Sequence, residues 1–514
     1  MDSSRTKNST LNLATTFGQQ MLNIVLRFAV RTVFVYTLGK SYLGINGLFA
    51  DILSMLSLAE FGFDAAIGYK LYKPLAEQND VAIRKYLRFF KYVYRVVSLV
   101  ILGIGILLIP FLPILIKDYE RLDALGIHAV LVYMLYLLQS VSGYLFFAYR
   151  SVIIKADQKT YLLNTANGIV DIVMSVVQIA ILLLWHNYIL YIVSLIGFVI
   201  IKNLVSLRIS QKRYHSYFAD TGERLSREEI KDIVKDCAAL FVFRADNMVM
   251  KATDNLILSS FHGLILVGEY SNYLMIYTML KSILAKMYES VKASMGNFFA
   301  QESVERKYAF FEATNFITIV LYGTAGGGIA VVTNELIECW LGESYIVMQP
   351  LPILIGIELV FAGIKMNLNQ IRNISGVFRQ MWYRPFIGIT INLCVSIIGV
   401  NLWGIHGVVV GTICSLILAN FLIDPGIIHK HCFGNYRPVL FYYIKNLGYM
   451  SILLLAVASA MWICNHVFTG CGWWSVIFHG IFCGIYIPGI LLIVYHRTAE
   501  CKFLINKIKI LKRN

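Results

Sequence analysis

Long runs of apolar residues separated by short polar connections fill almost the whole chain. A helix needs about 20 mostly apolar residues to cross the hydrocarbon core of a bilayer. Windows of that length predict about fourteen transmembrane helices. The predicted spans are residues 11–38, 42–71, 89–116, 123–151, 161–184, 188–209, 236–260, 268–292, 308–333, 349–372, 384–402, 405–428, 440–466 and 473–495.

Composition agrees with a membrane protein. Of the 514 residues, 58% are hydrophobic and only 15% are charged, and the mean hydropathy is +0.66. A soluble domain has no interior large enough for that much apolar surface, whereas a bundle of membrane helices requires it. The sequence therefore predicts an all-α polytopic membrane protein, with two pseudo-symmetric six-helix lobes and a further helix pair at the C-terminal end.

The formal net charge of +15 is concentrated in alternate connections between the spans. Even-numbered connections carry most of the loop cations, namely Lys73, Arg84, Lys85, Arg88, Lys155, Lys159, Lys212, Arg213, Arg224, Arg227, Arg306, Lys307, Arg379, Lys430 and Arg437. Because cytoplasmic loops are enriched in Lys and Arg, this pattern places both termini in the cytoplasm. It also indicates a membrane-orientation signal rather than a nucleic-acid surface.

Five segments are expected along the chain. Residues 1–210 form the first lobe, 211–235 a cytoplasmic linker, 236–430 the second lobe, 431–496 the additional helix pair, and 497–514 a basic amphipathic tail on the inner leaflet. The linker carries a capping-box signal, Ser226 followed three residues later by Glu229.

A weak internal repeat supports the two lobes. A shift of 224 residues (251 − 27 and 268 − 44) aligns Arg27 with Lys251 and Gly44 with Gly268. Matching halves of this kind are typical of transporters built from repeats.

Cations within the predicted spans are the main candidates for chemistry. Arg27 and Arg31 lie in the first span, and Arg244 and Lys251 lie in the seventh. A charged residue at the centre of a membrane helix costs roughly 2.5–3.5 kcal/mol even on insertion scales, so it must be paired or hydrated. At about 1.5 Å per residue, Arg27 and Lys251 both lie roughly 22 Å from the predicted inner ends of their helices. We expect these four cations to line a cavity that binds an anion such as a diphosphate.

Carboxylates within the spans leave two interpretations open. Asp246 and Asp254 are close enough along their helix to neutralise its cations, which would make the charges structural. Glu60 and Asp64 are placed too shallow to pair with Arg31, so they are either helix-end partners of loop cations or parts of a gate. Together with Glu358, these four carboxylates are the candidates for a gate or for ion coupling.

Catalytic motifs are missing from the sequence. There is no phosphate-binding loop for ATP, the ten histidines are dispersed without metal-ligand spacing, and no connection is long enough for a catalytic domain. We therefore expect neither an enzyme nor a cofactor or metal ion.

Three regions of the sequence resemble a known family. Residues 38–49 (LGKSYLGINGLF) resemble the first outer turn of bacterial polysaccharide-unit flippases of the MOP superfamily (Wzx-type). Residues 58–67 (LAEFGFDAAI) followed by 71–76 (LYKPLA) are similar to that family's second helix and first inner loop, and residues 267–271 (VGEYS) resemble its turn into the eighth helix.

The resemblance implies a two-lobed bundle that alternates between inward-open and outward-open forms. Its substrate would be an oligosaccharide on undecaprenyl diphosphate, moved to the outer leaflet for O-antigen, capsule or exopolysaccharide assembly. A proton or sodium gradient would drive transport, and glycan polymerase or assembly proteins would be partners alongside membrane lipids. Three alternatives remain open: a multidrug/cation antiporter of the same superfamily, a peptidoglycan-precursor flippase, and a non-transport scaffold of a glycan assembly complex.

Overall fold

The computed structural model describes residues 2–57, 63–117, 119–124, 127–218, 222, 224–377, 379–434, 436–467, 470 and 472–502. These residues form helices joined by short turns, and none of the described residues lies in a β-strand. The chain divides into two compact units, Met1–Gly268 and Glu269–Asn514. The all-α prediction is therefore confirmed, while the expected division at residues 211–235 stays a prediction.

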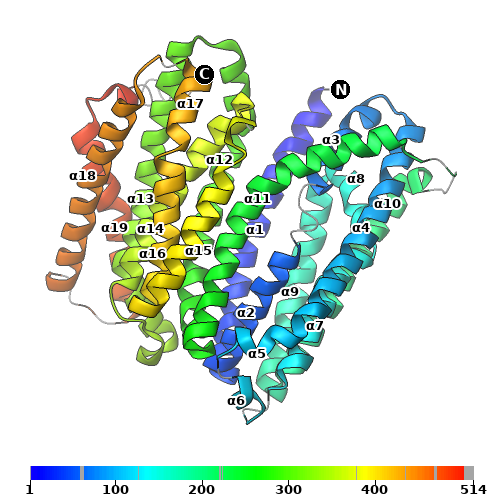
Figure 1. The fold of residues 1–514 in the computed structure, drawn as a ribbon, viewed down its shortest axis with the longest axis horizontal. Coiled ribbons are helices and arrows are strands. Elements are labelled where there is room, and N and C mark those ends of the chain that lie inside the picture. Colours follow the sequence, from blue (N-terminus) through cyan, green and yellow to red (C-terminus); the bar gives the residue numbers. More distant parts are fainter. Residues whose placement is uncertain are drawn as a thin grey trace. The chain divides into compact units, whose positions relative to one another are not determined.

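Unit 1 contains eleven α-helices among its described residues, and a twelfth begins at its end (Figure 1). They are α1 (Asp2–Leu38), α2 (Lys40–Leu56), α3 (Phe63–Ala76), α4 (Asp80–Leu108), α5 (Leu112–Leu115), α6 (Tyr119–Ala124), α7 (Ala129–Leu145), α8 (Ser151–Ala156), α9 (Thr160–Trp185), α10 (Tyr188–Tyr214) and α11 (Arg227–His262), followed by the first residues of α12 (Leu264–Gln301). Short 3₁₀ turns follow α4, α7 and α10.

Unit 2 contains most of α12 and seven further α-helices among its described residues (Figure 1). They are α13 (Val304–Leu341), α14 (Leu351–Ser375), α15 (Arg384–Trp403), α16 (Ile405–Ser415), α17 (Asp424–Phe433), α18 (Val439–His466) and α19 (Trp473–Tyr495). A π-helical segment, Leu416–Phe421, joins α16 to α17.

The helices are long enough and apolar enough for a multi-pass membrane protein. Within the described part of the chain, ten helices could cross a bilayer, or eleven when α7 and α8 are taken as one bent span. Helices lie within every expected window, but the expected count of fourteen is not confirmed. Two windows show departures from a simple apolar span. Residues 42–71 are split between α2 and α3. Helix α11 carries the charged residues Arg244, Asp246, Lys251 and Asp254.

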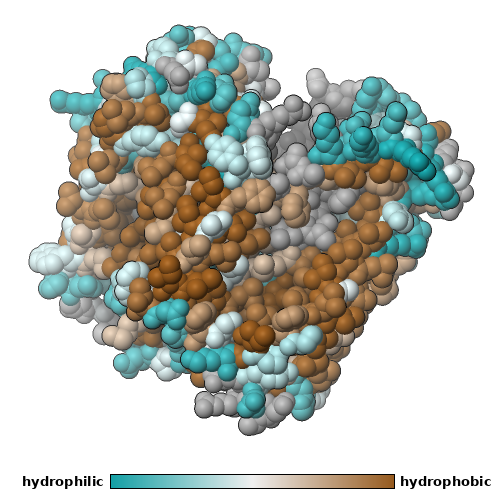
Figure 2. Space-filling view, viewed as in Figure 1, coloured by the Kyte–Doolittle hydropathy of each residue, from teal (hydrophilic) through white to brown (hydrophobic). Residues whose placement is uncertain are grey.

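The surface of each unit fits the same interpretation. Figure 2 shows hydrophobic residues along the sides of the visible helices and hydrophilic residues gathered toward helix ends. Among the tryptophans near helix ends, Trp185, Trp403, Trp473 and Trp474 are exposed, as in the aromatic belt of a membrane protein, whereas Trp340 is buried.

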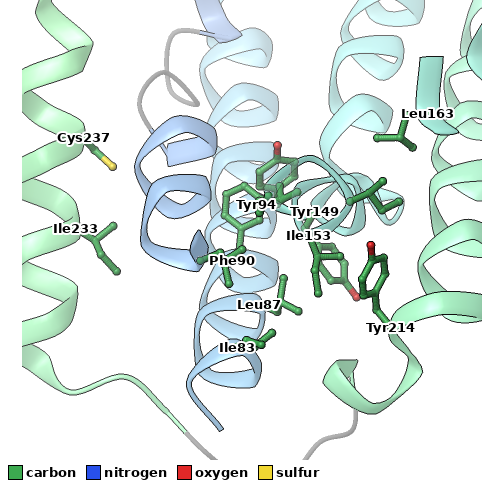
Figure 3. Packing of buried hydrophobic residues seen from close by; sticks show 14 residues of the cluster. Ile83, Leu87, Phe90, Tyr94, Tyr149, Ile153, Leu163, Tyr214, Ile233 and Cys237 are labelled. Carbon is green, nitrogen blue, oxygen red and sulfur yellow. The ribbon is translucent and has the colours of Figure 1, made fainter. Parts of the chain in front are cut away.

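In unit 1, α9 packs along α1 and α10, and α7 packs between α4 and α10. A cluster of buried apolar residues joins α4, α8, α10 and α11 (Figure 3). Ile83, Leu87 and Phe90 come from α4, Ile153 from α8, and Ile233 from α11. Helices from distant parts of the sequence are thereby held together by one apolar core.

The start of α11 confirms the predicted capping box. The backbone N–H of Glu229 donates to the Ser226 Oγ at 3.1 Å, and the backbone N–H of Ser226 donates to the Glu229 Oε2 at 2.6 Å. Two backbone donors that have no partner within the helix are satisfied in this way.

Hydrogen bonds hold the far end of α11 in unit 1. Asn255 donates to the Asp51 carboxylate on α2. The Ser259 hydroxyl donates to the Leu115 carbonyl at 2.7 Å, and the Lys117 ammonium donates to the Phe261 carbonyl at 2.7 Å. These bonds explain why α11 clusters with the first ten helices.

Two glycines allow the start of α12 to approach α2 within unit 1. A Cβ atom on Gly44 would lie 2.0 Å from the carbonyl oxygen of Leu264, and one on Gly268 would lie 2.5 Å from that of Lys40. Distances this short exclude any side chain at either position. These are the two glycines that the 224-residue shift aligns.

In unit 2, glycines allow the same close packing between neighbouring helices. Gly326 of α13 faces Gly356 of α14, and Gly399 of α15 faces Gly407 of α16. The pair α18 and α19 packs on α13 through a separate apolar cluster that includes Leu453, Ala460, Cys483 and Ile487.

Two ionic groups join the helices of unit 2, and the first of them is fully buried. The Arg384 Nε lies 3.2 Å from the Asp424 Oδ1, and both side chains are only 1% exposed. Lys445 of α18 pairs with Glu312 of α13 and with Glu500, which follows α19. Ionic contacts of this kind specify which helix ends meet.

Replacing Gly44 with alanine should lower the free energy of unfolding by about 1–3 kcal/mol, because the new Cβ would overlap backbone atoms. The measurement is the thermal unfolding midpoint of the detergent-solubilised protein. Gly103→Ala is the matched control, since a Cβ at Gly103 has no atom within 4 Å. Equal effects of the two substitutions would contradict the close-approach argument.

Arg384→Met should destabilise the protein by about 3–5 kcal/mol, because it leaves the buried Asp424 carboxylate without its ionic partner. The double variant Arg384→Met/Asp424→Asn should recover much of that loss. Arg306→Met removes an exposed arginine that pairs with Glu302 at 3.0 Å and should change stability by less than about 1 kcal/mol. Unfolding midpoints that are the same for all three variants would show that the buried pair has no special role.

Candidate functional site

Unit 1 contains an open cavity of about 750 Å³. Its walls come from α1, α2, α4, α7, the start of α8 and α10. The lining residues are Arg27, Asn46, Ala50, Leu53, Ser54, Ser57, Tyr94, Tyr136, Gln139, Ser140, Gly143, Tyr144, Ala148, Ser151, Tyr191, Leu195, Val199 and Asn203. The volume is within the usual range for small-molecule sites.

The lining combines one cation with many neutral hydrogen-bonding groups. Arg27 is the charged residue of the lining, and the described lining residues include no carboxylate. Amides are supplied by Asn46, Gln139 and Asn203, and hydroxyls by serines and tyrosines. Such a wall can bind a phosphate through the guanidinium and polar, uncharged groups through the amides and hydroxyls.

A break in one membrane span opens onto this cavity. Helices α7 and α8 are bent by 40° relative to each other, and Phe147 between them has a left-handed φ of 59°. Residues on both sides of the break, including Gly143 and Ser151, line the cavity. Asn203 of α10 donates to the carbonyl oxygen of Ser142 at 3.1 Å. Irregular backbone is tolerated at membrane depth where it borders a cavity, and broken helices recur at transporter binding sites.

A tyrosine network forms one wall of the cavity. The Tyr136 hydroxyl donates to the Asn46 side-chain oxygen and lies 3.4 Å from the Tyr188 hydroxyl. Tyr188 stacks on Tyr191, with ring centroids 6.3 Å apart. Arg31 interacts electrostatically with Tyr136 and Tyr191. The two arginines of α1 therefore have different surroundings: Arg27 lines the cavity, and Arg31 lies near the tyrosine wall.

The predicted residues of the seventh span all lie on α11. Asp246 and Asp254 are buried, and each makes a polar or electrostatic contact. For Arg244 and Lys251 the structure describes the backbone, and their side chains lie outside the described atoms. The expected meeting of Lys251 with Arg27 therefore stays a prediction.

The two carboxylates of the second span are also not tested. Glu60 lies outside the described residues, and Asp64 is described only as part of the backbone of α3. Their proposed role in a gate stays a prediction.

In unit 2, Glu358 belongs to a buried polar triad. Its carboxylate is hydrogen-bonded to Tyr277 and interacts electrostatically with Lys281. The Lys281 ammonium in turn donates to the Tyr277 hydroxyl at 3.0 Å. A buried carboxylate held between a cation and a hydroxyl is suited to exchanging an ion, although pairing alone also accounts for the contacts.

Most of the residues that line the cavity were not predicted from the sequence. Asn46, Gln139 and Asn203 are neutral residues within predicted spans, whereas the predicted site residues were all charged. A polar amide in an apolar helix is itself a signal, because it requires a partner or water. Among the described residues, no group of three or more His, Cys, Asp or Glu side chains is placed to hold a metal ion.

Comparison with known proteins identifies the fold. No protein-family model and no curated protein matches the sequence. A solved structure of a multidrug resistance MATE family transporter of the MOP superfamily, in an inward-facing conformation, superposes with a TM-score of 0.64 at 13% identity. It covers 83% of this chain and 100% of its own. The lipid II flippase MurJ superposes with a TM-score of 0.60 at 17% identity, over 95% of this chain and 99% of its own.

A third structure, the Vibrio cholerae MATE transporter VcmN, superposes with a TM-score of 0.52 at 14% identity. It covers 84% of this chain and 100% of its own. Identities this low establish shared architecture rather than shared substrate. This multi-pass membrane protein has the fold of MOP-superfamily transporters.

Proposed function

We propose that this protein is a flippase for lipid-linked oligosaccharides. It moves repeat units carried on undecaprenyl diphosphate from the inner to the outer leaflet of the bacterial cytoplasmic membrane by alternating access. The observation that supports this proposal is the unit 1 cavity, which combines the Arg27 guanidinium with amides, hydroxyls and tyrosine rings. In this proposal Arg27 contacts the diphosphate, and the neutral polar wall contacts the sugars.

Sugar hydroxyls need both donors and acceptors, which the side chains of Asn46, Gln139 and Asn203 supply. Tyrosine rings such as Tyr94 and Tyr144 add flat apolar surfaces for the C–H faces of a sugar. Arg31, Arg244 and Lys251 extend the proposed anion site beyond the lining residues. The lipid tail remains in the bilayer, because only the head group is too polar to cross the membrane unaided.

The absence of a carboxylate among the described lining residues argues against the multidrug/cation antiporter, which needs an acidic partner for its cation. A peptidoglycan-precursor flippase has the same diphosphate chemistry, and MurJ is named for such a substrate. Deleting the gene separates these functions: loss of a surface glycan with intact wall synthesis supports the oligosaccharide substrate. Altered drug sensitivity with normal surface glycan would instead support the antiporter.

Arg27→Gln should slow transport roughly tenfold or more, because a charge-assisted hydrogen bond to an anion is worth about 1.5–3 kcal/mol. The measurement is the protection of a fluorescent polyprenyl-diphosphate oligosaccharide from a membrane-impermeant quencher in proteoliposomes. Arg27→Lys should retain part of the rate. Arg213→Gln, an exposed arginine near the end of α10, is the control and should transport normally.

The double variant Arg27→Ala/Lys251→Ala tests the wider anion site in cells. With membrane insertion verified, it should abolish the surface glycan. A normal amount of surface glycan would reject the cavity as the transport site. A scaffold role predicts that outcome, because a scaffold needs the fold but not these two cations.

Vectorial transport requires an energy source, and we propose that Glu358 takes part in proton or sodium coupling. Glu358→Gln should remove the acceleration that an imposed ion gradient produces, while exchange without a gradient continues. Glu343→Gln, at an exposed position beyond α13, should keep the acceleration. Proton and sodium gradients are imposed separately, and unchanged acceleration by both in Glu358→Gln would exclude Glu358 as the coupling residue.

A further inference from the structure

Unit 1 has a second hollow, of about 490 Å³, that the proposed transport does not use. It lies where the end of α3, the start of α4 and the start of α11 meet. The lining residues are Lys70, Tyr72, Lys73, Pro74, Glu77, Asn79, Val81, Ala82, Lys85, Tyr86, Leu225 and Glu229. By the distribution of loop cations, this end of unit 1 faces the cytoplasm.

Three lysines and two carboxylates are the charged groups of this hollow, and both carboxylates already have partners. Glu229 accepts the backbone N–H of Ser226, and this bond holds the pKa of Glu229 below its ordinary value. Glu77 pairs with the exposed Lys73 at 3.8 Å. Lys70 and Lys85 are half-buried, and Lys85 lies close enough to Glu229 to interact with it electrostatically. Because three cations face two carboxylates, the lining has an excess of positive charge.

The hollow lies beside the apolar cluster of unit 1. Leu75, Tyr86 and Leu225 pack against the apolar cluster of Figure 3, in which Ile83 comes from α4 and Ile233 from α11. Asn79 caps the first turn of α4 by accepting the backbone N–H of Ala82 at 3.0 Å. One backbone donor at this helix end is therefore already occupied, and the charged groups of the lining are side chains.

Apolar side chains lie beside these cations. Tyr72 is 51% exposed and Val81 is 43% exposed, and both line the hollow. A soluble anion would gain nothing from these surfaces, whereas a lipid brings a phosphate and an apolar body together. Basic pockets at the cytoplasmic ends of membrane helices are suited to anionic lipid head groups.

We propose that the hollow lined by Lys70, Lys85 and Tyr72 binds the phosphate head group of an anionic phospholipid of the inner leaflet. The bound lipid would join α3, α4 and the start of α11, and would thereby stabilise unit 1. This inference is independent of the transported substrate, because the hollow and the 750 Å³ cavity share no lining residue.

The test is the thermal unfolding midpoint of the full-length, detergent-solubilised protein titrated with short-chain phosphatidylglycerol. Phosphatidylcholine is the neutral-lipid control, and inorganic pyrophosphate is the soluble-phosphate control. Phosphatidylglycerol should raise the midpoint, and the other two should not. Lys70→Ala/Lys85→Ala should weaken the apparent affinity for phosphatidylglycerol roughly tenfold or more, because each of the two cations contributes to the free energy of binding an anionic head group.

Two further variants separate the site from general charge effects. Lys70→Arg/Lys85→Arg keeps both charges and should retain the shift. Lys212→Ala/Lys430→Ala removes two exposed lysines outside the hollow and should also retain it. An equal shift with phosphatidylcholine, or an equal loss in the Lys212/Lys430 variant, would overturn the proposal. A shift by pyrophosphate that Lys70→Ala/Lys85→Ala abolishes would overturn the lipid source and indicate a soluble phosphate ligand instead.

Discussion

Satisfying polar and ionised groups within apolar helices is the constraint on which this structure depends. Lipid offers no partner to such groups, so they must be paired, hydrated or placed beside a cavity. Arg384 meets this requirement with Asp424 at 3.2 Å, and Glu358 meets it with Tyr277 and Lys281. Arg27 meets it differently, because it lines a cavity. Arg384 and Asp424 thus form a closed pair, whereas Arg27 lies at the wall of a cavity.

Close helix packing makes that arrangement possible. Gly44 and Gly268 let α12 begin directly against α2, and the α7–α8 bend places Gly143 and Ser151 on the cavity wall. This fold thus brings neutral polar side chains from four helices, α2, α4, α7 and α10, and from the start of α8, around the single arginine of α1.

The cavity and the basic hollow illustrate two uses of positive charge in one unit. In the cavity, Arg27 is surrounded by amides and hydroxyls that suit an uncharged, hydroxyl-rich group beside an anion. In the hollow, Lys70 and Lys85 lie beside exposed apolar side chains at a helix end. In the two proposals both sites bind phosphates, but their surroundings favour different attached groups. The proposed ligands therefore differ because the groups beside the cations differ.

Sequence alone determined the helical class, the placement of the long apolar helices and the Ser226–Glu229 capping box, because these depend on local composition and spacing. It also singled out Arg27 and Glu358, since an ion in an apolar run is visible without a fold. Tertiary structure alone decided that Arg31 lies near a tyrosine wall, that Asn46, Gln139 and Asn203 line a cavity, and that Arg384 pairs with Asp424. These contacts join residues far apart along the chain, and their distances depend on how helices bend and pack.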